Sequence, residues 1–285
     1  MIPANQPETI IQQQKMLKQQ ASPTFPIHYW HDDNLLAAHK PSGLLVHRSA
    51  ISSDRISLVG LLREQTKLSL HPIHRLDRAT SGIILFGKNP EITAQLGSIF
   101  RERQVNKAYL AVVRGWIEEA GLIDKSIKTI KNDGPLRRVE AQTYYEPLQR
   151  IELPLPCGRY ETTRLTLLLV KPHTGRRHQI RIHMEKLSHP IIGDTTYGDS
   201  RHNYLFRDHF DSNRLLLHSF ALGMEHPLTE EQIGLFAPPM ESITGLFNDF
   251  DKEALQERLE EEWNIQTSYS VASSIDSVGT GLQEE

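Results

Sequence analysis

Much of the chain alternates between apolar and polar residues, which is the pattern of half-buried strands. A continuous apolar run in residues 82–88 predicts a further strand, buried on both faces. The alternating segments predict strands within 26–43, where two short strands flank an Asp-Asp-Asn turn, and within 106–116, 159–172 and 213–227. Strands therefore dominate the expected secondary structure.

Helical spacing is found in single segments between these strands. Residues 56–66 carry apolar residues at helical intervals, and in 89–103 Asn89 is suited to cap a helix that begins with Pro90. The acid-rich segment 246–266 also has helical character. Single helices among many strands predict an α+β fold around one large mixed or mostly antiparallel sheet, and this order does not suit a doubly wound nucleotide-binding fold.

The two ends of the chain differ from its middle. Residues 1–26 are rich in Gln and poor in apolar residues, so we expect a flexible extension. Residues 265–285 are acidic and rich in Ser, which predicts a disordered tail. Residues 27–264 then form the folded unit, although a length of 285 residues allows one large domain or two small ones.

The net charge of −3 conceals an uneven distribution. Residues 251–285 hold nine acids and two bases, which leaves 30 bases and 26 acids in residues 1–250. The body is therefore mildly basic, as a nucleic-acid partner requires. The single cysteine, Cys157, excludes an internal disulfide and a cysteine-rich zinc site. With no signal peptide and no apolar stretch long enough for a bilayer, we expect a cytoplasmic protein without a membrane partner.

The segment HPIHRLDRATSG, residues 71–82, places Asp77 between Arg75 and Arg78, just before a buried strand. An acid in this position can form a turn or a local ion pair, and it can also be a catalyst on an exposed loop. A kinase catalytic loop is excluded, because Leu76 interrupts its His-Arg-Asp motif and no glycine-rich loop is present. The segment alone leaves the role of Asp77 open.

In the strand of residues 106–116, Lys107 and Tyr109 are two positions apart and point to the same face. If Ala108 and Leu110 face the core, Lys107 and Tyr109 belong to a mixed face that suits a cleft. Tyr109 can equally be an ordinary amphipathic residue at the rim of a sheet.

Residues 171–190, KPHTGRRHQIRIHMEKLSHP, hold five bases, four histidines and one acid. If Thr174 caps a helix, Arg177 and Arg181 lie beside its apolar stripe, one turn apart. Two cations at this spacing repel each other unless an anion lies opposite, either an RNA phosphate or a buried carboxylate. A solvated basic face is the other interpretation. The histidine pairs of the chain lack the spacing of a helical zinc site, so we expect no metal.

Three segments, in this order, resemble the signature segments of the RluA-type pseudouridine synthases: HRLDRATSG before a strand, NKAYLAVVRG, and TGRRHQIRIHMEKLSHPIIGD. The turn in KPSGLLVHRS strengthens the resemblance, which runs from about residue 28 to 238. The family converts uridine in RNA to its C-glycoside isomer, with neither redox chemistry nor an energy source. The resemblance therefore implies no cofactor, and a pseudouridine-synthase fold with a central basic cleft. Because the first 25 residues are too short and too polar for the S4 domain of some relatives, we expect none.

The resemblance also assigns roles to three residues. Asp77 matches the essential aspartate, which either attacks the sugar or removes a sugar proton. Arg181 matches the arginine that pairs with this carboxylate and lowers its pKa. Tyr109 matches the tyrosine that packs on the target base and is a candidate for removing the C5 proton.

A uridine in a stem must be flipped out to react, and Arg75 matches the family arginine that fills the gap. Five further residues are expected to bind the substrate, the four bases among them through phosphates: His74, Lys107, Lys171, Arg176 and Arg177. The segments VHRSAISSD, GRYETTRLTL and GDSRHNYLFRDHF resemble family members that act on uridine 65 of tRNA. We therefore expect a monomer that modifies tRNA there, in the acceptor/T-stem region; another tRNA site or rRNA is the alternative.

Two other classes of function stay open at this point. A non-catalytic RNA-binding protein needs the basic segment but has no use for Asp77 together with Tyr109. A hydrolase that pairs Asp77 with His74 needs a metal or a second acid nearby, and the sequence indicates neither.

Overall fold

The computed structural model describes residues 27–47, 56–130 and 136–271. The predicted extension, 1–26, and the end of the predicted tail, 272–285, lie outside the described residues. The boundary expected at residue 264 is too early, because Thr267–Ser270 form a strand, β13, that pairs with the strand Gln232–Phe236, β12.

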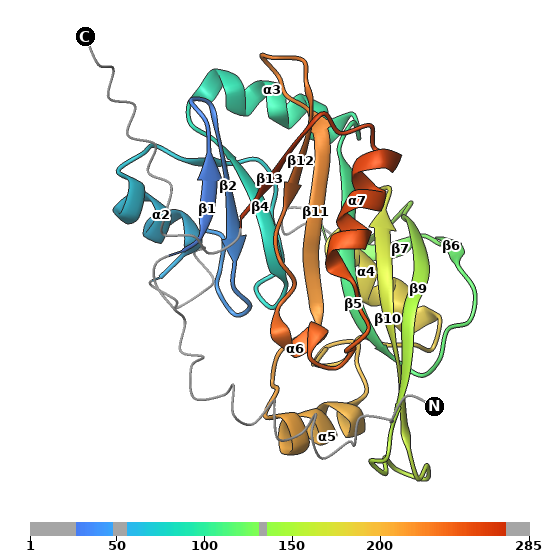
Figure 1. Ribbon diagram of the computed structural model, residues 1–285. Helices are drawn as coiled ribbons and strands as arrows, with labels where there is room; N and C mark the ends of the chain where they lie inside the picture. The colour runs from blue at the N-terminus through green and yellow to red at the C-terminus, as the bar shows by residue number, and fades with distance from the viewer. Residues whose placement is uncertain (1–26, 48–55, 131–135, 272–285) are drawn as a thin grey trace.

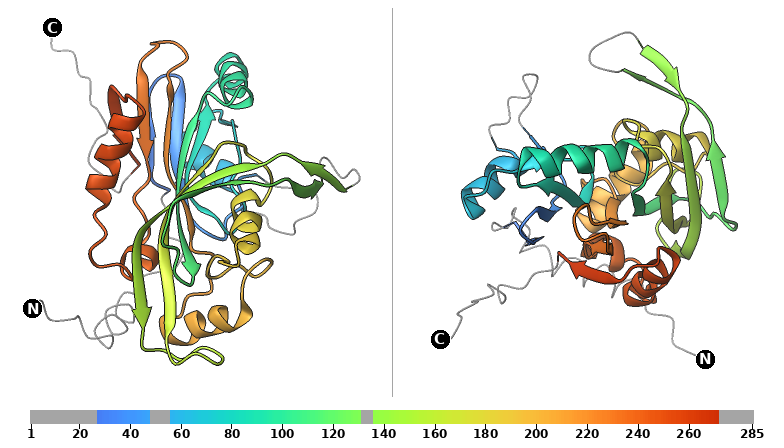
Figure 2. Two further views of the ribbon diagram at one scale, coloured as in Figure 1. Left: turned by 90° about the vertical axis from the view of Figure 1, so that its right-hand side faces the viewer. Right: turned by 90° about the horizontal axis from the view of Figure 1, so that it is seen from above.

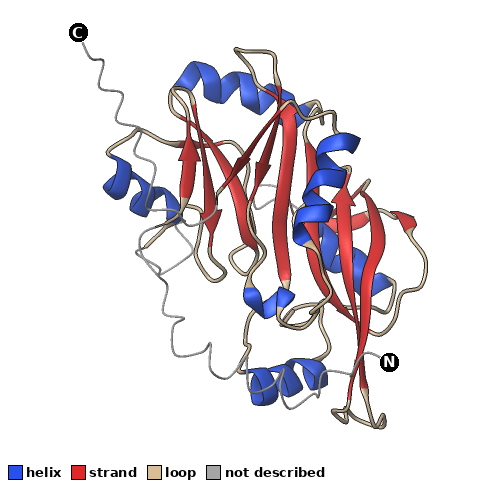
Figure 3. Ribbon diagram, in the orientation of Figure 1, coloured by secondary structure: helices blue, strands red, loops and turns tan. Residues whose placement is uncertain are grey.

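Eleven of the described strands form one mixed sheet, and two form a separate hairpin (Figures 1 and 3). In chain order the strands are β1 (Tyr29–His31), β2 (Leu35–Lys40), β3 (His71–Pro72), β4 (Ser81–Gly87), β5 (Asn106–Arg114), β6 (Gly121–Asp124), β7 (Ile127–Ile130), β8 (Leu136–Val139), β9 (Gln142–Leu153), β10 (Thr163–Pro172), β11 (Leu217–Glu225), β12 and β13. The main path through the sheet is β1-β2-β4-β11-β5-β10-β9-β6. The expected α+β fold with a large mixed sheet is confirmed.

Helices cover both faces of this sheet, as Figure 1 shows. They are α2 (Leu58–Thr66), α3 (Pro90–Arg101), α4 (Gln179–Lys186), α5 (Ser200–Phe210), α6 (Glu241–Thr244) and α7 (Lys252–Glu262). Apolar residues of α4 pack with β5 and β10 on one face, and those of α5, α6 and α7 pack on the other face. Within the described part of the chain, no helix is both long and apolar enough to cross a membrane.

The strand β4 lies between two layers of core, which explains its continuous apolar sequence. Ile83 and Leu85 pack with α3, whereas Ile84 and Phe86 pack with α2. All residues of β4 are buried, as the sequence predicts. At its start Gly82 has φ of 110°, and a Cβ atom there would be 2.2 Å from the backbone oxygen of Ser219 on β11. Only glycine permits this approach of the two strands.

The helix expected from Thr174 begins later. Its first residue is Gln179, and its N-cap is His178, which has φ of 57° and makes no capping bond with its side chain. The hydroxyl of Thr174 instead donates to Gln179 Oε1 at 2.6 Å. Arg177 therefore precedes the helix, and the predicted repulsion between two cations one turn apart does not arise.

Candidate active site

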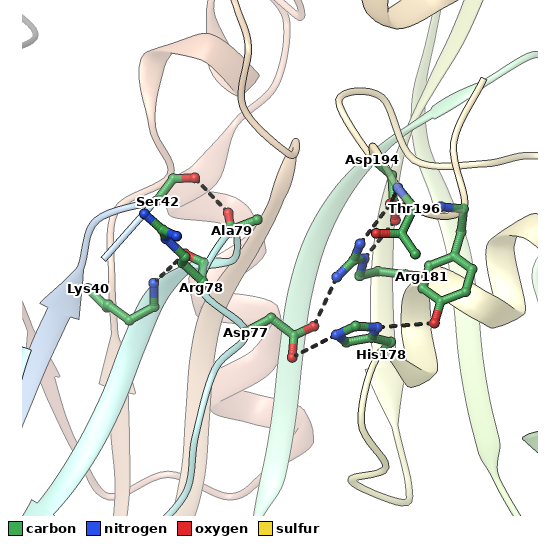
Figure 4. A network of polar contacts seen from close by, with 10 residues as sticks. Lys40, Ser42, Asp77, Arg78, Ala79, His178, Arg181, Asp194 and Thr196 are labelled. Atoms are coloured by element: carbon green, nitrogen blue, oxygen red, sulfur yellow. Dashed lines mark hydrogen bonds and ion pairs between the residues drawn. The ribbon is translucent and has the colours of Figure 1, made fainter. Parts of the chain in front are cut away.

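Lys40, the last residue of β2, fixes the loop that carries Asp77. Its buried ammonium group donates to the backbone oxygens of Leu44, Pro41 and Arg78 at 2.8, 2.9 and 3.0 Å (Figure 4). Burial lowers the pKa of Lys40 to about 7, although the negative charge of Asp77 acts against this shift. The conformation of the Asp77 loop thus depends on the lysine of the Lys-Pro-Ser-Gly turn.

The same turn holds the loop at two further points. The hydroxyl of Ser42 donates to the backbone oxygen of Ala79 at 2.6 Å, and the backbone N–H of Gly43 donates to the oxygen of Arg78 at 2.8 Å. The side chain of Arg78 returns a bond to the oxygen of Gly43 at 2.9 Å. Arg78 therefore joins two loops, whereas Asp77 between them directs its carboxylate toward α4 (Figure 4).

Arg181 on α4 contacts two carboxylates. Its Nη1 atom is 3.4 Å from Oδ2 of Asp77, which is the contact that the family resemblance implies. Its Nε and Nη2 atoms donate to the two carboxylate oxygens of Asp194, both at 2.7 Å. The Arg181 side chain is only 7% exposed and that of Asp194 is 0% exposed. A bidentate, buried pair of this kind fixes the guanidinium plane.

The loop around Asp194 completes the clamp on Arg181. Asp194 Oδ1 also accepts the backbone N–H groups of Thr196 and Tyr197 at 2.9 and 3.0 Å. Burial by itself raises the pKa of Asp194, but the hydrogen bonds from Arg181, Tyr197 and Thr196 outweigh it and lower the pKa. No role was assigned to Asp194 from the sequence, because an acid in a loop has no periodic signal.

His178 is a second residue of the site without a role assigned from the sequence. Its Nε2 atom is 3.7 Å from Oδ1 of Asp77, and its Nδ1 atom is 3.1 Å from the hydroxyl of Tyr197. Burial lowers the pKa of His178 against the opposing charge of Asp77. The Tyr197 ring also lies 5.2 Å from the guanidinium carbon of Arg181. A left-handed backbone at a residue other than glycine is a conformation that clusters at functional sites.

Tyr109 on β5 reaches the same region from the sheet. It is half-buried, lies opposite Ser219 of β11 and packs against the apolar cluster around α4. Burial raises its pKa to about 12, and the charge of Asp77 adds to this shift. The phenol is therefore protonated at neutral pH. Ala111 and Val113, on the same face of the strand, are fully buried and do not line a cleft.

Three of the predicted RNA contacts are exposed: Arg75, Arg176 and Arg177. The Nε atom of Arg176 donates to the backbone oxygen of Glu140 at 3.3 Å. Lys107 is half-buried, and burial lowers its pKa. All four side chains are at least partly exposed, as a residue that contacts RNA must be.

Two predicted substrate contacts have other partners. Lys171 forms an ion pair with Glu262 of α7, on the face of the sheet opposite α4. His74 stacks on Phe100 at 4.9 Å, and its Nε2 atom accepts the backbone N–H of Leu85 at 3.0 Å. Burial lowers the pKa of His74 to about 3, so the ring is neutral. His74 therefore supports the start of the loop that carries Asp77. It does not form the pair with Asp77 that a hydrolase requires.

The described residues contain no group of three or more His, Cys, Asp or Glu placed to hold a metal ion. What they bring together around Asp77 is a carboxylate, a clamped arginine, a neutral imidazole and a protonated phenol. This set can stabilise an anion, transfer a proton or attack a carbon atom.

Comparisons with known proteins show what the chain is similar to. The family model described as RNA pseudouridylate synthase matches residues 34–186. The chain is 42% identical over 230 residues to the tRNA pseudouridine synthase C of Vibrio parahaemolyticus, covering 78% of this chain and 94% of that protein. It is also 42% identical over 233 residues to the protein of the same name from Haemophilus influenzae, covering 79% and 97%.

A solved structure supports the fold independently. Human RNA pseudouridylate synthase domain containing 1 superposes with a TM-score of 0.66 at 23% identity, covering 84% of this chain and 98% of the human chain. At that identity the likeness concerns the fold alone.

Proposed function

The chain belongs to the RNA pseudouridylate synthase family, in its RluA-type branch, and on this premise we propose that it isomerises uridine to pseudouridine in tRNA. Relatives named tRNA pseudouridine synthase C, 42% identical over nearly their whole length, support tRNA as the substrate. The observation that carries the proposal is the position of Asp77, on a fixed loop and 3.4 Å from a clamped arginine.

In the proposed reaction Asp77 acts on the ribose as an ionised carboxylate. The bond from N1 to the sugar carbon breaks, the uracil turns and C5 bonds to the same carbon; the C5 proton then leaves and N1 takes up a proton, so that the product is an isomer of the substrate. Both routes for the first step, attack on the sugar carbon and removal of a sugar proton, need a carboxylate that is charged and fixed. Arg181, held by Asp194, supplies a fixed positive charge beside this carboxylate.

Tyr109 is assigned to the uracil. Its ring packs against the base, and its hydroxyl oxygen is the candidate acceptor for the C5 proton. Because its pKa is about 12, the phenol is protonated at neutral pH, and packing is the role that this state supports directly.

We place the target at uridine 65 in the acceptor/T-stem region, from the resemblance of three segments outside the signature motifs. The uridine is flipped out of its stem, and Arg75 occupies the gap that it leaves. Arg176, Arg177 and Lys107 contact phosphates and orient the tRNA on a single copy of the chain.

Release of tritium from tRNA labelled at uridine C5 tests the reaction, because isomerisation releases the C5 hydrogen whereas binding and hydrolysis do not. We expect one tritium for each tRNA with the wild-type protein and none with Asp77→Ala, which should still bind tRNA. Release by Asp77→Ala at the wild-type rate, or no release by the wild-type protein from any tRNA, would overturn the proposal. Mapping of the modified nucleotide then distinguishes position 65 from another tRNA site.

A further inference from the structure

A buried polar network lies behind the loop of Asp77. Its centre is Ser81, the first residue of β4 and four positions after Asp77. His218 of β11 is opposite Ser81 in the parallel register, and its Nδ1 atom is 2.9 Å from the hydroxyl of Ser81. By alternation His218 shares a face of β11 with Leu216 and Phe220, which pack with α5, α6 and α7. The network is therefore on the face of the sheet opposite α4 (Figure 2, left).

The hydrogen bonds of this network have a defined direction. Burial lowers the pKa of His218 to about 3, so its ring is neutral. Its Nε2 atom is 3.1 Å from the backbone oxygen of Ala237, which can only accept, so Nε2 carries the proton and Nδ1 accepts from Ser81. Nη2 of Arg214 donates to the same hydroxyl at 2.9 Å. Ser81 is therefore held from two sides, by a donor and by an acceptor.

Arg214 joins this network to the loop that clamps Arg181. Its backbone oxygen lies so close to Gly193 that a Cβ atom there would be 1.8 Å from it. Gly193 has φ of 78° and precedes Asp194, the carboxylate that holds Arg181. The side chain of Arg214 thus holds one end of the Asp77 loop, while its backbone packs against the loop of the arginine clamp.

The guanidinium group of Arg214 pairs with no carboxylate among the described residues. Its Nε atom is buried and makes no hydrogen bond there, and Nη1 contacts the sulfur of Met240, a weak acceptor. Burial lowers the pKa of Arg214 to about 10, so the group is still charged at neutral pH. A buried charge without a counterion costs stability, and departures of this kind are expected at functional sites.

We propose that Arg214 is a positioning residue for the reaction at Asp77, acting through the hydroxyl of Ser81. It fixes the end of the Asp77 loop relative to the arginine clamp, and so it sets the contact of 3.4 Å between Asp77 and Arg181. His218 completes the network by orienting the hydroxyl. The inference rests on the proposed function, since the reaction is the one assigned to Asp77. A displacement of about 1 Å at a reacting group lowers a rate by about 100-fold.

Substitutions in the full-length chain test this role. Arg214→Met removes the donor and keeps the length of the side chain, Arg214→Lys restores one donor, and Ser81→Ala removes the hydroxyl. His226→Leu is the matched control for His218→Leu, because His226 is also buried and hydrogen-bonded but follows the other end of β11. The readouts are single-turnover tritium release at saturating protein, equilibrium binding of tRNA transcript, and amide hydrogen exchange of residues 76–80 without RNA.

We expect Arg214→Met, Ser81→Ala and His218→Leu to lower the rate by about 10- to 100-fold, with the affinity for tRNA within about 2-fold of the wild type. Arg214→Lys should recover most of the rate. Amide exchange of residues 76–80 should become faster, since the N–H of Thr80 donates within this loop at 3.1 Å. The double variant Arg214→Met/Ser81→Ala should be no slower than the slower single variant, because both changes break the same bond.

A wild-type rate in Arg214→Met or Ser81→Ala would overturn the proposal, and so would additive losses in the double variant or an equal loss of rate in His226→Leu. Weaker tRNA binding at an unchanged rate would also contradict it, because Arg214 would then be an RNA contact. If Arg214→Met does not fold, Ser81→Ala decides the outcome. Hydrogen exchange separates this inference from the proposed function. If the wild-type protein released no tritium, faster exchange in Arg214→Met but not in His226→Leu would leave the positioning role standing while the isomerase function fell.

Discussion

Asp194 holds Arg181 more closely than Asp77 does. Two guanidinium nitrogens of Arg181 are 2.7 Å from Asp194, whereas the nearest contact to Asp77 is 3.4 Å. The arginine is therefore fixed by a residue that is itself fully buried, and its remaining nitrogen is presented to Asp77. This division keeps a positive charge beside Asp77, while the bidentate pair that fixes the guanidinium is made with Asp194.

Asp194→Asn should lower the rate of tritium release at saturating tRNA by about 10- to 100-fold, with the affinity for tRNA little changed. The amide keeps the size of the side chain but removes the charge that orients Arg181. Removing one partner of a buried ion pair costs about 3–5 kcal/mol of stability, which denaturant unfolding measures. Asp199→Asn is the matched control. Asp199 forms an ion pair with Arg114, with Oδ2 and Nη1 2.5 Å apart, and this pair lies away from Asp77. An equal loss of rate in Asp199→Asn would contradict a specific role for Asp194.

His178→Asn should reduce the rate at saturation and change the acid side of its pH profile. Asn tolerates the left-handed backbone that His178 adopts, so the fold is kept while the imidazole beside Asp77 is lost. The pKa of His178 is lowered, so the ring gains its charge only below the usual range of histidine, and the acid limb of the wild-type profile should include this ionisation. His178→Gly also removes the ring and in addition relieves any strain of the left-handed backbone, so a comparison of the two variants separates these two effects. A pH profile in both variants identical to that of the wild type would argue against a role for the imidazole.

His74→Gln should leave activity at neutral pH unchanged and make the protein more resistant to acid. Because the folded-state pKa is about 3, below the ordinary 6.5, the unfolded chain binds the extra proton between these values. Stability is lost as the pH falls through this window, by up to about 1.4 kcal/mol for each pH unit. The glutamine oxygen can still accept the N–H of Leu85. Denaturant unfolding at pH 4 and 7 measures the difference, and weakened tRNA binding would instead favour the expected role of His74 in binding the substrate.

Arg176→Gln should weaken tRNA binding and reduce its salt dependence, whereas Lys171→Gln should leave both unchanged. Arg176 is exposed beside the base of the hairpin, but Lys171 is paired with Glu262 on the opposite face of the sheet. Both changes remove one positive charge, so net charge cannot explain a difference between them. Equal losses in the two variants would show that the opposite face also binds tRNA.

The strands were predictable because each depends on a local pattern, whereas the contact between Asp77 and Arg181, 104 positions apart in the chain, was expected only from the family resemblance. The apolar run of β4 and the cap and proline at the start of α3 match the structure closely. Asp194 and His178 were missed for a different reason. An acid in a loop and a histidine before a helix acquire meaning only when the fold brings them to Arg181 and Asp77, and neither has a periodic signal. Lys171 was expected to contact RNA but pairs with Glu262 on the other face of the sheet. Its charge alone does not indicate on which face of a strand the side chain lies.

The position of β11 has a consequence for synthesis of the chain. This strand lies between β4 and β5, parallel to the first and antiparallel to the second, and it is formed by residues 217–225. Until the ribosome has released it, the two halves of the sheet have no strand between them, and each leaves an open edge that can pair with another chain. Folding therefore finishes late, through contacts between distant residues, which makes it slow. A nascent chain that stops before β11 should aggregate or be degraded, and it cannot assemble the centre around Asp77.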